Sequence, residues 1–315
     1  MTATAKSTSL LHRVSSWLAS EGYPTEFRTA NIFQKHGFHV TQGAYVRGDA
    51  EGLKREIDVL ASITARASSG FLRISYVVEC KWSADKPWIV FTSPSTRMAP
   101  SACIAQTISS KLGEAIVWAI AGNETLQSLQ TFLTPEKGGF GGRQAFSKGN
   151  DAFYSAVQAS VSNSISYVAE HDRGRRTKGT MPEAGVVAFP LVLVDGDIFA
   201  AYFDSDAGEV KIEPTDHVRC HWRGSPAWEF LATLDVVSMK HLDMFISKRA
   251  EEAKVTLSIM MNSYDEIKDF CSSGSPKALT VTPGPRGFVG APSLVCEFLA
   301  VHGEAASGHV GDNNR

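Results

Sequence analysis

Two strand-like runs joined by a short turn carry charged side chains at places where a buried strand normally has none. The first run, REIDVLASI, alternates apolar and polar residues in period two and holds Glu56 and Asp58 on its polar side. The second run, FLRISYVVECKW, is apolar apart from Arg73 and Ser75 until it reaches Glu79 and Lys81. An ion buried without a partner is costly, so these four charges require either water or a shared purpose.

The turn TARASSG between the runs predicts an antiparallel pair of strands about 4.8 Å apart. In a matching register Asp58 lies beside Glu79, and each of the two carboxylates then has a raised pKa unless a cation sits between them. A hard divalent ion such as Mg²⁺ accepts one or two carboxylates and keeps several waters. Lys81 is placed to orient a metal-bound water or to balance the charge on a phosphate, so the pattern suits phosphodiester hydrolysis.

The residues before this pair predict two helices and a first strand. Apolar residues at helical spacing favour an amphipathic helix over residues 8–20. The stretch TEFRTANIFQKHG predicts a second helix, with Thr25 as its N-cap and Gly37 as its stop. FHVTQGAYVR follows as a strand, so the local order is helix and then three strands.

The later chain alternates helices, loops and strands. The stretch Asp195-Gly196-Asp197 between two apolar runs signals a hairpin. Other predicted elements are a proline-containing loop at 83–100, helices at 101–121 and 151–170, a glycine-rich flexible loop at 135–150, a strand ending at 239, and a long helix at 240–261. A main domain at 1–271 and a loosely ordered Gly/Ser/Pro-rich segment at 272–315 follow from composition.

The spacing of the charges resembles the PD-(D/E)xK nuclease superfamily, which includes Mrr-type restriction endonucleases and Holliday-junction resolvases. Asp58 stands 21 positions before Glu79-Cys80-Lys81, YVVECKW is similar to the third core strand of the family, and FRTANIFQKHGFHV is similar to its first helix. The resemblance implies a restriction-endonuclease-like αβββαβ core, with a mixed central sheet flanked by helices and a C-terminal α/β extension.

The same resemblance implies the roles of the charged residues and a Mg²⁺ or Mn²⁺ cofactor. It makes Asp58 and Glu79 metal ligands together with the backbone carbonyl of Cys80, and it makes Lys81 the catalytic lysine. Glu26, early in the first helix, becomes an accessory carboxylate that binds the metal from outside or positions water.

One departure from the family pattern leaves the accessory position open. The proline that often precedes the aspartate is replaced by Ile57, and Glu56 comes before it. Glu56 is therefore an alternative to Glu26. A glutamine that some members place after the third strand has two candidates, Gln158 and Gln106, for which a solvated helix position is the competing interpretation.

Two basic loops are candidates for contact with the DNA backbone, because Arg and Lys contacts to phosphate dominate such binding. A solvated surface loop is the alternative for both. The residues are Arg173, Arg175, Arg176 and Lys178 in HDRGRRTKGT, and Arg143 with Lys137 and Lys148 in the glycine-rich stretch.

Composition narrows the class of protein. A net charge of −2 argues against a protein that coats nucleic acid without specificity but permits a local basic surface. Five cysteines without CxxC spacing favour a reducing compartment over a disulfide framework. No signal-peptide core and no apolar run of about 20 residues is present, so the expected location is the cytoplasm, with no membrane partner.

These observations predict a metal-dependent DNA endonuclease, with a role in defence or DNA repair and a homodimer as further expectations. The alternative is a catalytically inactive nuclease fold that acts as a DNA-binding or assembly module. RNA or branched DNA is a third substrate that the same chemistry permits.

Overall fold

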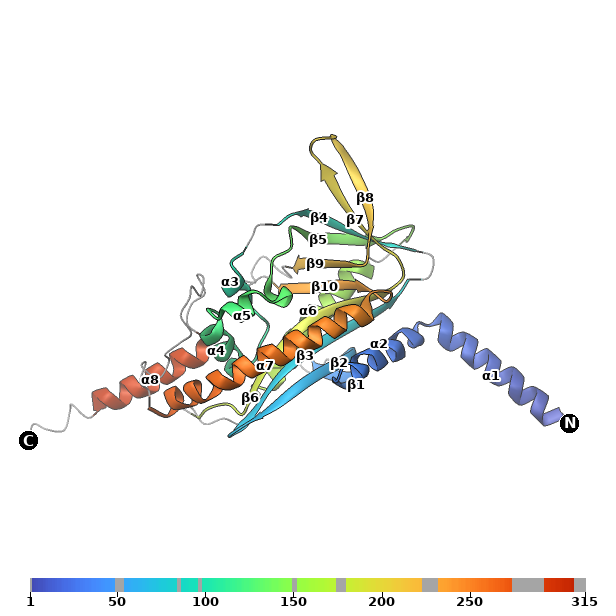
Figure 1. Cartoon of the computed structure of the whole chain (residues 1–315). Helices are drawn as coiled ribbons and strands as arrows, with labels where there is room; N and C mark the ends of the chain where they lie inside the picture. Colours follow the sequence, from blue (N-terminus) through green and yellow to red (C-terminus); the bar gives the residue numbers. More distant parts are fainter. Residues whose placement is uncertain are drawn as a thin grey trace, which may run out of the picture.

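A single mixed β-sheet organises the part of the chain that the computed structural model describes (Figure 1). That part comprises residues 2–48, 54–83, 86–95, 98–148, 152–173, 180–222, 232–273 and 292–308. The strands are β1 (His39–Arg47), β2 (Lys54–Ala67), β3 (Gly70–Trp82), β4 (Trp88–Pro94), β5 (Lys137–Gln144), β6 (Ala184–Asp195), β7 (Ile198–Asp204), β8 (Glu209–Thr215), β9 (His217–Trp222) and β10 (Ala232–Ser238). Their order in the sheet is β1-β2-β3-β6-β10-β9-β5-β4-β7-β8.

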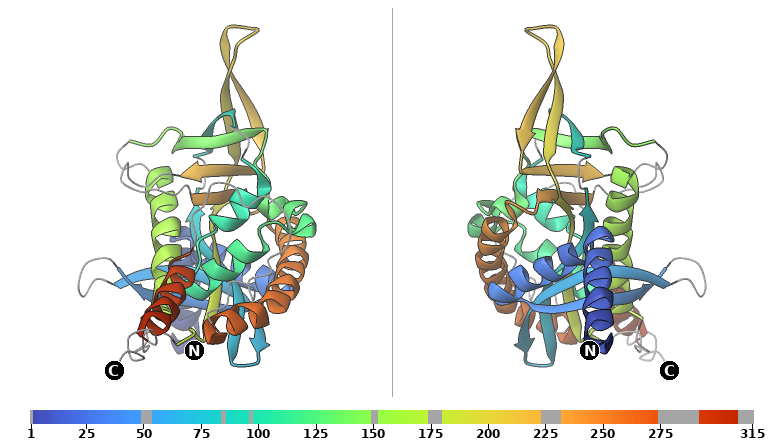
Figure 2. Two further views of the ribbon diagram at one scale, coloured as in Figure 1. Left: turned by 90° about the vertical axis from the view of Figure 1, so that its left-hand side faces the viewer. Right: turned by 90° about the vertical axis from the view of Figure 1, so that its right-hand side faces the viewer.

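Helices cover both faces of this sheet (Figure 2). They are α1 (Thr2–Ser20), α2 (Tyr23–Lys35), α3 (Pro100–Ala105), α4 (Lys111–Ile120), α5 (Glu124–Gln127), the 3₁₀ turn η1 (Gln130–Phe132), α6 (Ala152–Glu170), α7 (Leu242–Ser273) and α8 (Ser293–Gly308). The prediction of a mixed α/β fold with a large central sheet flanked by helices is confirmed.

The predicted trio of strands forms one edge of the sheet. β1 pairs antiparallel with β2, and β2 pairs antiparallel with β3 from Ala67↔Gly70 to Val59↔Val78. On its other side β3 pairs in parallel with β6 up to Trp82↔Asp195. The predicted helix before these strands is α2, which begins after Gly22 rather than at Thr25 and ends just before Gly37, where φ is +86°.

Two apolar cores hold the helices against the sheet. Phe33 of α2 and Leu112 of α4 are fully buried in the core that also takes in α7 and α8. Phe153 and Val161 of α6 are buried in the core on the opposite face. Complete burial of each such side chain contributes about 1.5–3 kcal/mol, so α2 and α6 are fixed on opposite sides of β3.

The glycine-rich stretch forms strand β5, and the prediction of a flexible loop there is wrong. An added Cβ on Gly139 would lie 2.4 Å from Cys220 Sγ, and one on Gly142 would lie 2.6 Å from the Ile89 carbonyl oxygen. The glycines therefore allow β5 to pack closely against neighbouring strands. The proline-containing loop predicted before it likewise contains a strand, β4.

Strands β6 and β7 do not form the predicted hairpin. β7 instead pairs in parallel with β4 and antiparallel with β8, and the β7–β8 hairpin projects from the body (Figure 1). The helix predicted at 101–121 is interrupted between α3 and α4. There Ser110 caps α4 with its side chain and Ser109 bridges to Val187 of β6.

Part of the segment at 272–315, which composition predicts to be loosely ordered, is helical. α8 buries Leu294, Val295 and Phe298 in the core beside α4 and α7. The Gly/Pro-rich stretch at the start of the segment dominates its composition and hides the apolar residues that follow. Burial of those residues is what holds α8 against the core.

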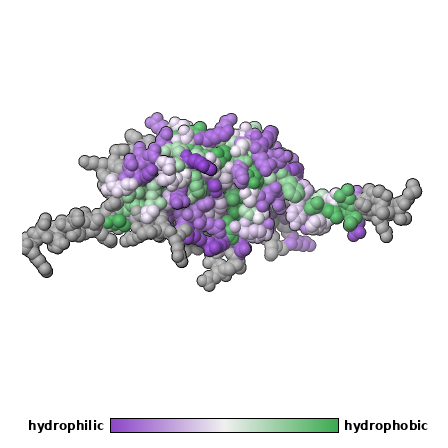
Figure 3. Space-filling model, turned by 90° about the horizontal axis from the view of Figure 1, so that it is seen from below, coloured by the Kyte–Doolittle hydropathy of each residue, from purple (hydrophilic) through white to green (hydrophobic). Residues whose placement is uncertain are grey.

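The helix predicted at 8–20 is present as α1, which extends away from the sheet (Figure 1). Its apolar stripe is exposed, with 68% exposure of Leu11 and 53% of Trp17, and Figure 3 shows the apolar colour on this projection. The ring centroids of Trp17 and Tyr23 are 5.8 Å apart. None of the helices in the described ranges has the length and apolar content needed to cross a bilayer.

Candidate functional site

Asp58 lies where strand β2 changes faces. Ile57 belongs to the core under α6, whereas Val59 belongs to the core under α2 and α7, although residues two apart in a regular strand share a face. Gly43, between the β1 residues that pair with Ile57 and Val59, adopts φ +59°. The ladder with β3 stops at Val59↔Val78, so β2 twists away from β3 at the aspartate.

This departure leaves a backbone donor of β3 to be satisfied by a side chain. The N–H of Cys80 donates to Asp58 Oδ2 at 2.7 Å, while β3 continues to pair with β6 on its other edge. A buried N–H without an acceptor is costly, so the hydrogen bond draws the aspartate carboxylate toward the end of β3.

Glu79 and Lys81 share a face of β3 and form an ion pair. Lys81 Nζ donates to Glu79 Oε1 at 2.6 Å, and the two side chains are 33% and 12% exposed respectively. Burial, reinforced by the neighbouring charge of Asp58, raises the pKa of Glu79 to about 7, although Lys81 opposes the rise. Burial also raises the pKa of Asp58, against the hydrogen bond from Cys80 and the charge of Lys81. Burial by itself would lower the pKa of Lys81, but Glu79 and then Asp58 raise it above its usual value.

Both candidates for the accessory carboxylate are near this group. Glu26, in the first turn of α2, has a pKa raised by burial, then by Asp58 and then by Glu56. Glu26 in turn contributes to the raised pKa of Glu79. Glu56 is exposed, and its carbonyl oxygen accepts a hydrogen bond from Asn163 Nδ2 of α6 at 2.8 Å.

The donor set fits a hard divalent cation held by two carboxylates. Asp58 and Glu79 each have one oxygen engaged by a group of this chain, which leaves the other oxygen for a ligand. Oxygen ligands of this kind suit Mg²⁺ or Mn²⁺, which keep several waters. Within the described ranges no group of three or more His, Cys, Asp or Glu residues forms a ready metal cage. The fit is therefore to two carboxylates and water.

A further acid, Asp195, is part of this region and was not recognised from the sequence as a site residue. Asp195 Oδ2 accepts hydrogen bonds from Thr25 Oγ1 at 2.9 Å and from the guanidinium of Arg28, both in α2. The available signal was the Asp-Gly-Asp stretch, which suggested a hairpin turn. The predicted N-cap Thr25 is inside the helix and uses its hydroxyl for this contact.

The predicted DNA-contacting residues are not gathered at the carboxylates by any described contact. Arg143 is exposed on β5. A guanidinium nitrogen of Arg173 is 4.0 Å from Oε1 of Glu170, three residues earlier in the chain. Arg175, Arg176 and Lys178 lie outside the described residues.

Neither glutamine candidate has a described contact with the carboxylates. Gln158 donates to Ser162 Oγ of its own helix at 3.0 Å, and its buried Oε1 has no hydrogen-bond partner among the described residues. Gln106 lines a separate cavity at the C-terminal end of α3.

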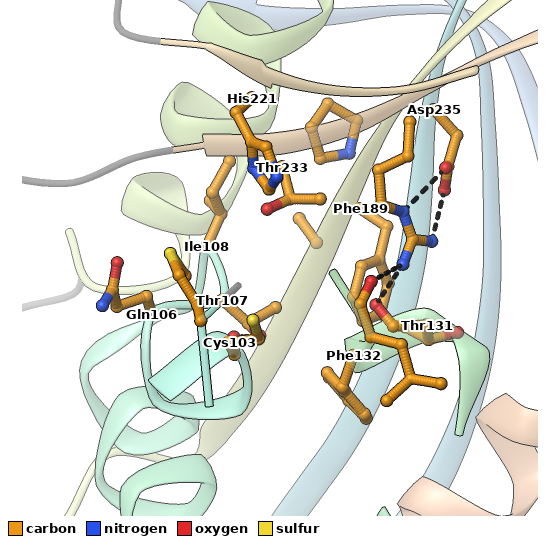
Figure 4. Close-up of a pocket in the computed structure, with 15 residues that line it drawn as sticks. Cys103, Gln106, Thr107, Ile108, Thr131, Phe132, Phe189, His221, Thr233 and Asp235 are labelled. Atoms are coloured by element: carbon orange, nitrogen blue, oxygen red, sulfur yellow. Dashed lines mark hydrogen bonds and ion pairs between the residues drawn. The ribbon is translucent and has the colours of Figure 1, made fainter. Parts of the chain in front are cut away.

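That cavity encloses about 30 Å³ and is lined by residues from α3, η1, β6, β9 and β10 (Figure 4). Its charges satisfy one another. Arg219 donates to both oxygens of Asp235 at 2.9 Å and also to the carbonyls of Gln130, Thr131 and Leu133. The volume is room for about one or two waters, so we assign this network to the fold rather than to chemistry.

The two buried acid sites differ in how they are neutralised. Burial tends to raise the pKa of Asp235, but Arg219 and His217 hold it far below its usual range. At the end of β3 the pKa values of Glu26, Asp58 and Glu79 are all raised, even with Lys81 beside them. At Asp235 the attraction of Arg219 and His217 outweighs burial, whereas at the end of β3 burial and the neighbouring acids outweigh the attraction of Lys81.

No family model, curated protein or solved structure matches this chain.

Proposed function

We propose that this protein is a metal-dependent DNA endonuclease of the PD-(D/E)xK type, with the restriction-endonuclease-like core formed by α2, β1, β2, β3, α6 and β6. The observation that carries the proposal is the excess of buried acids over cations at the end of β3. Asp58 and Glu79 have raised pKa values although Lys81 forms an ion pair with one of them. Such an imbalance favours a cation from solution.

Asp58 and Glu79 would hold the cation, with the Cys80 carbonyl beside them and Glu26 as the accessory carboxylate. When bound, Mg²⁺ or Mn²⁺ polarises a phosphate oxygen and makes a water more acidic. Lys81, kept protonated by Glu79 and Asp58, supplies positive charge for the phosphate as negative charge develops on it. The carboxylates orient the attacking water relative to that lysine.

The test is cleavage by the purified protein of plasmid and linear DNA with Mg²⁺, Mn²⁺ or EDTA. We expect cleavage with either metal and none with EDTA, and we expect Lys81→Ala to reduce the rate by at least about 100-fold. The matched control is Lys86→Ala, which removes an exposed lysine shortly after β3 and should leave the rate unchanged. Undiminished cleavage by Lys81→Ala would remove this lysine from the mechanism.

The second candidate is a nuclease fold that binds DNA without cutting it. The ion pair of Lys81 with Glu79 favours this candidate, because the chain itself places a cation on one of the two carboxylates. DNA retention in a mobility-shift assay, with no cleavage of duplex DNA, branched DNA or RNA under any metal condition, would select it.

A further inference from the structure

Asp195 joins the helix that carries Glu26 to the sheet. Its carboxylate accepts hydrogen bonds from the Thr25 hydroxyl, in a side chain that is buried, and from Arg28, which is half exposed. Thr25 and Arg28 flank Glu26 in the first turns of α2. The contact therefore fixes the backbone on both sides of the glutamate.

The same residue fixes the end of the strand that carries Glu79 and Lys81. Asp195 pairs with Trp82, and its carbonyl oxygen accepts from the Ser83 N–H at 3.2 Å. The next residue, Gly196, approaches Ser83 so closely that an added Cβ would lie 2.7 Å from its Cβ. One short segment thus sets α2 and the end of β3 relative to each other.

The hydrogen bonds between Asp195 and the first turns of α2 oppose electrostatic repulsion at Glu26. Glu26 is near the carboxylates of Asp58 and Glu56, and their repulsion adds to burial in raising its pKa, while Lys81 offsets it only in part. The apolar anchors of α2, Ala30 and Phe33, lie one to two turns further along the helix. The N-cap, Gly22, offers no side chain to cap the first turn. Repulsion at Glu26 therefore acts on the end of the helix that the apolar core holds least.

We propose that Asp195 is a positioning residue, which through Thr25 and Arg28 holds the first turn of α2 against the repulsion at Glu26 and so sets the affinity of the carboxylate group for a divalent cation. This inference rests on the proposed function for the role of the cation. The position of α2 is a separate consequence that does not require catalysis.

The first experiment compares Asp195→Asn with Asp197→Asn, two residues further on. Asp197 pairs with Lys240 at 2.6 Å, and both side chains are more than 60% exposed, so its loss leaves α2 untouched. Calorimetric titration with Mn²⁺ should show affinity weakened about three- to tenfold in Asp195→Asn, and no change in Asp197→Asn. Hydrogen exchange of the metal-free protein should become faster at residues 23–28 in Asp195→Asn alone.

A second experiment separates positioning from general support of the fold. In a Glu26→Gln background the repulsion is absent, so adding Asp195→Asn should change neither Mn²⁺ affinity nor exchange in α2. Arg28→Ala removes the exposed hydrogen bond between α2 and Asp195 and should reproduce the effects of Asp195→Asn. It replaces Asp195→Asn in these measurements if that variant folds poorly. In cleavage assays Asp195→Asn should lower kcat more than it raises KM.

The outcomes distinguish the two hypotheses. Equal Mn²⁺ affinity and equal exchange in wild type and Asp195→Asn overturn the positioning role, as does an undiminished effect in the Glu26→Gln background. A wild type that neither binds Mn²⁺ nor cleaves refutes the proposed function. The exchange comparison then decides by itself whether Asp195 holds α2.

Discussion

The raised pKa of Glu79 makes the stability of the metal-free protein depend on pH in a direction that one substitution can isolate. In the folded chain this carboxyl keeps its proton until about pH 7, whereas its ordinary pKa is 4.5. Between these values the folded state binds more protons than the unfolded state, so stability falls as pH rises. The stabilising contribution is present below about pH 4.5 and lost above about pH 7. At about 1.4 kcal/mol per pH unit it amounts to about 3 kcal/mol.

Glu79→Gln tests this reasoning because the amide resembles the protonated acid and does not titrate. Urea unfolding in EDTA gives the free energy of unfolding at about pH 4.5 and pH 8. From pH 4.5 to pH 8 the free energy of unfolding of the variant should rise by about 3 kcal/mol relative to that of wild type. The attraction between Lys81 and the Glu79 carboxylate is already contained in the pKa of about 7, so it needs no separate deduction.

Addition of Mn²⁺ provides the matching arm of the experiment. At pH 8 the cation should raise the free energy of unfolding of wild type through preferential binding to the folded state, and it should have little effect on Glu79→Gln. The reasoning is refuted if the stability difference between wild type and variant is the same at both pH values.

Two further predictions concern the other buried acids. Asp58→Asn should remain folded, because the amide oxygen can still accept from the Cys80 N–H, but it should abolish cleavage because the carboxylate is lost. Asp58→Ala should also abolish cleavage, and urea unfolding should show about 1–3 kcal/mol lower stability because that N–H is left without an acceptor. Arg219→Ala leaves Asp235 buried with only His217 beside it and should cost about 3–5 kcal/mol, whereas the exposed-pair variant Lys240→Ala should unfold like wild type.

The part of the fold that the sequence predicts well is local. Period-two alternation and one short turn are enough to define β2 and β3, but Asp58 reaches the end of β3 through its hydrogen bond with Cys80, beyond the last pair of the ladder. Glu26 also reaches this group, because α2 packs back across the strands that follow it directly. Each of these relations spans a short stretch of chain, so sequence pattern carries most of the information.

The elements that sequence reasoning missed depend on distant neighbours. Glycines in β5 look like a loop until Cys220 of β9 is seen to require their small size. The stretch Asp195-Gly196-Asp197 looks like a hairpin until α2, about 170 residues earlier, is found to bind Asp195. Leu294 and Phe298 become core residues only because α4 and α7 offer them an apolar surface.

The departure of β2 from β3 explains why acids collect at this end of the sheet. A strand that leaves its neighbour exposes an unpaired N–H, and here the Asp58 carboxylate satisfies it. That hydrogen bond brings the aspartate beside Glu79, which directly precedes Cys80 in β3. Satisfying the backbone therefore creates the repulsion between the acids, and Lys81 relieves it only in part. Because the same geometry places the aspartate beside a second acid, binding of the proposed cation would relieve this repulsion at the end of β3.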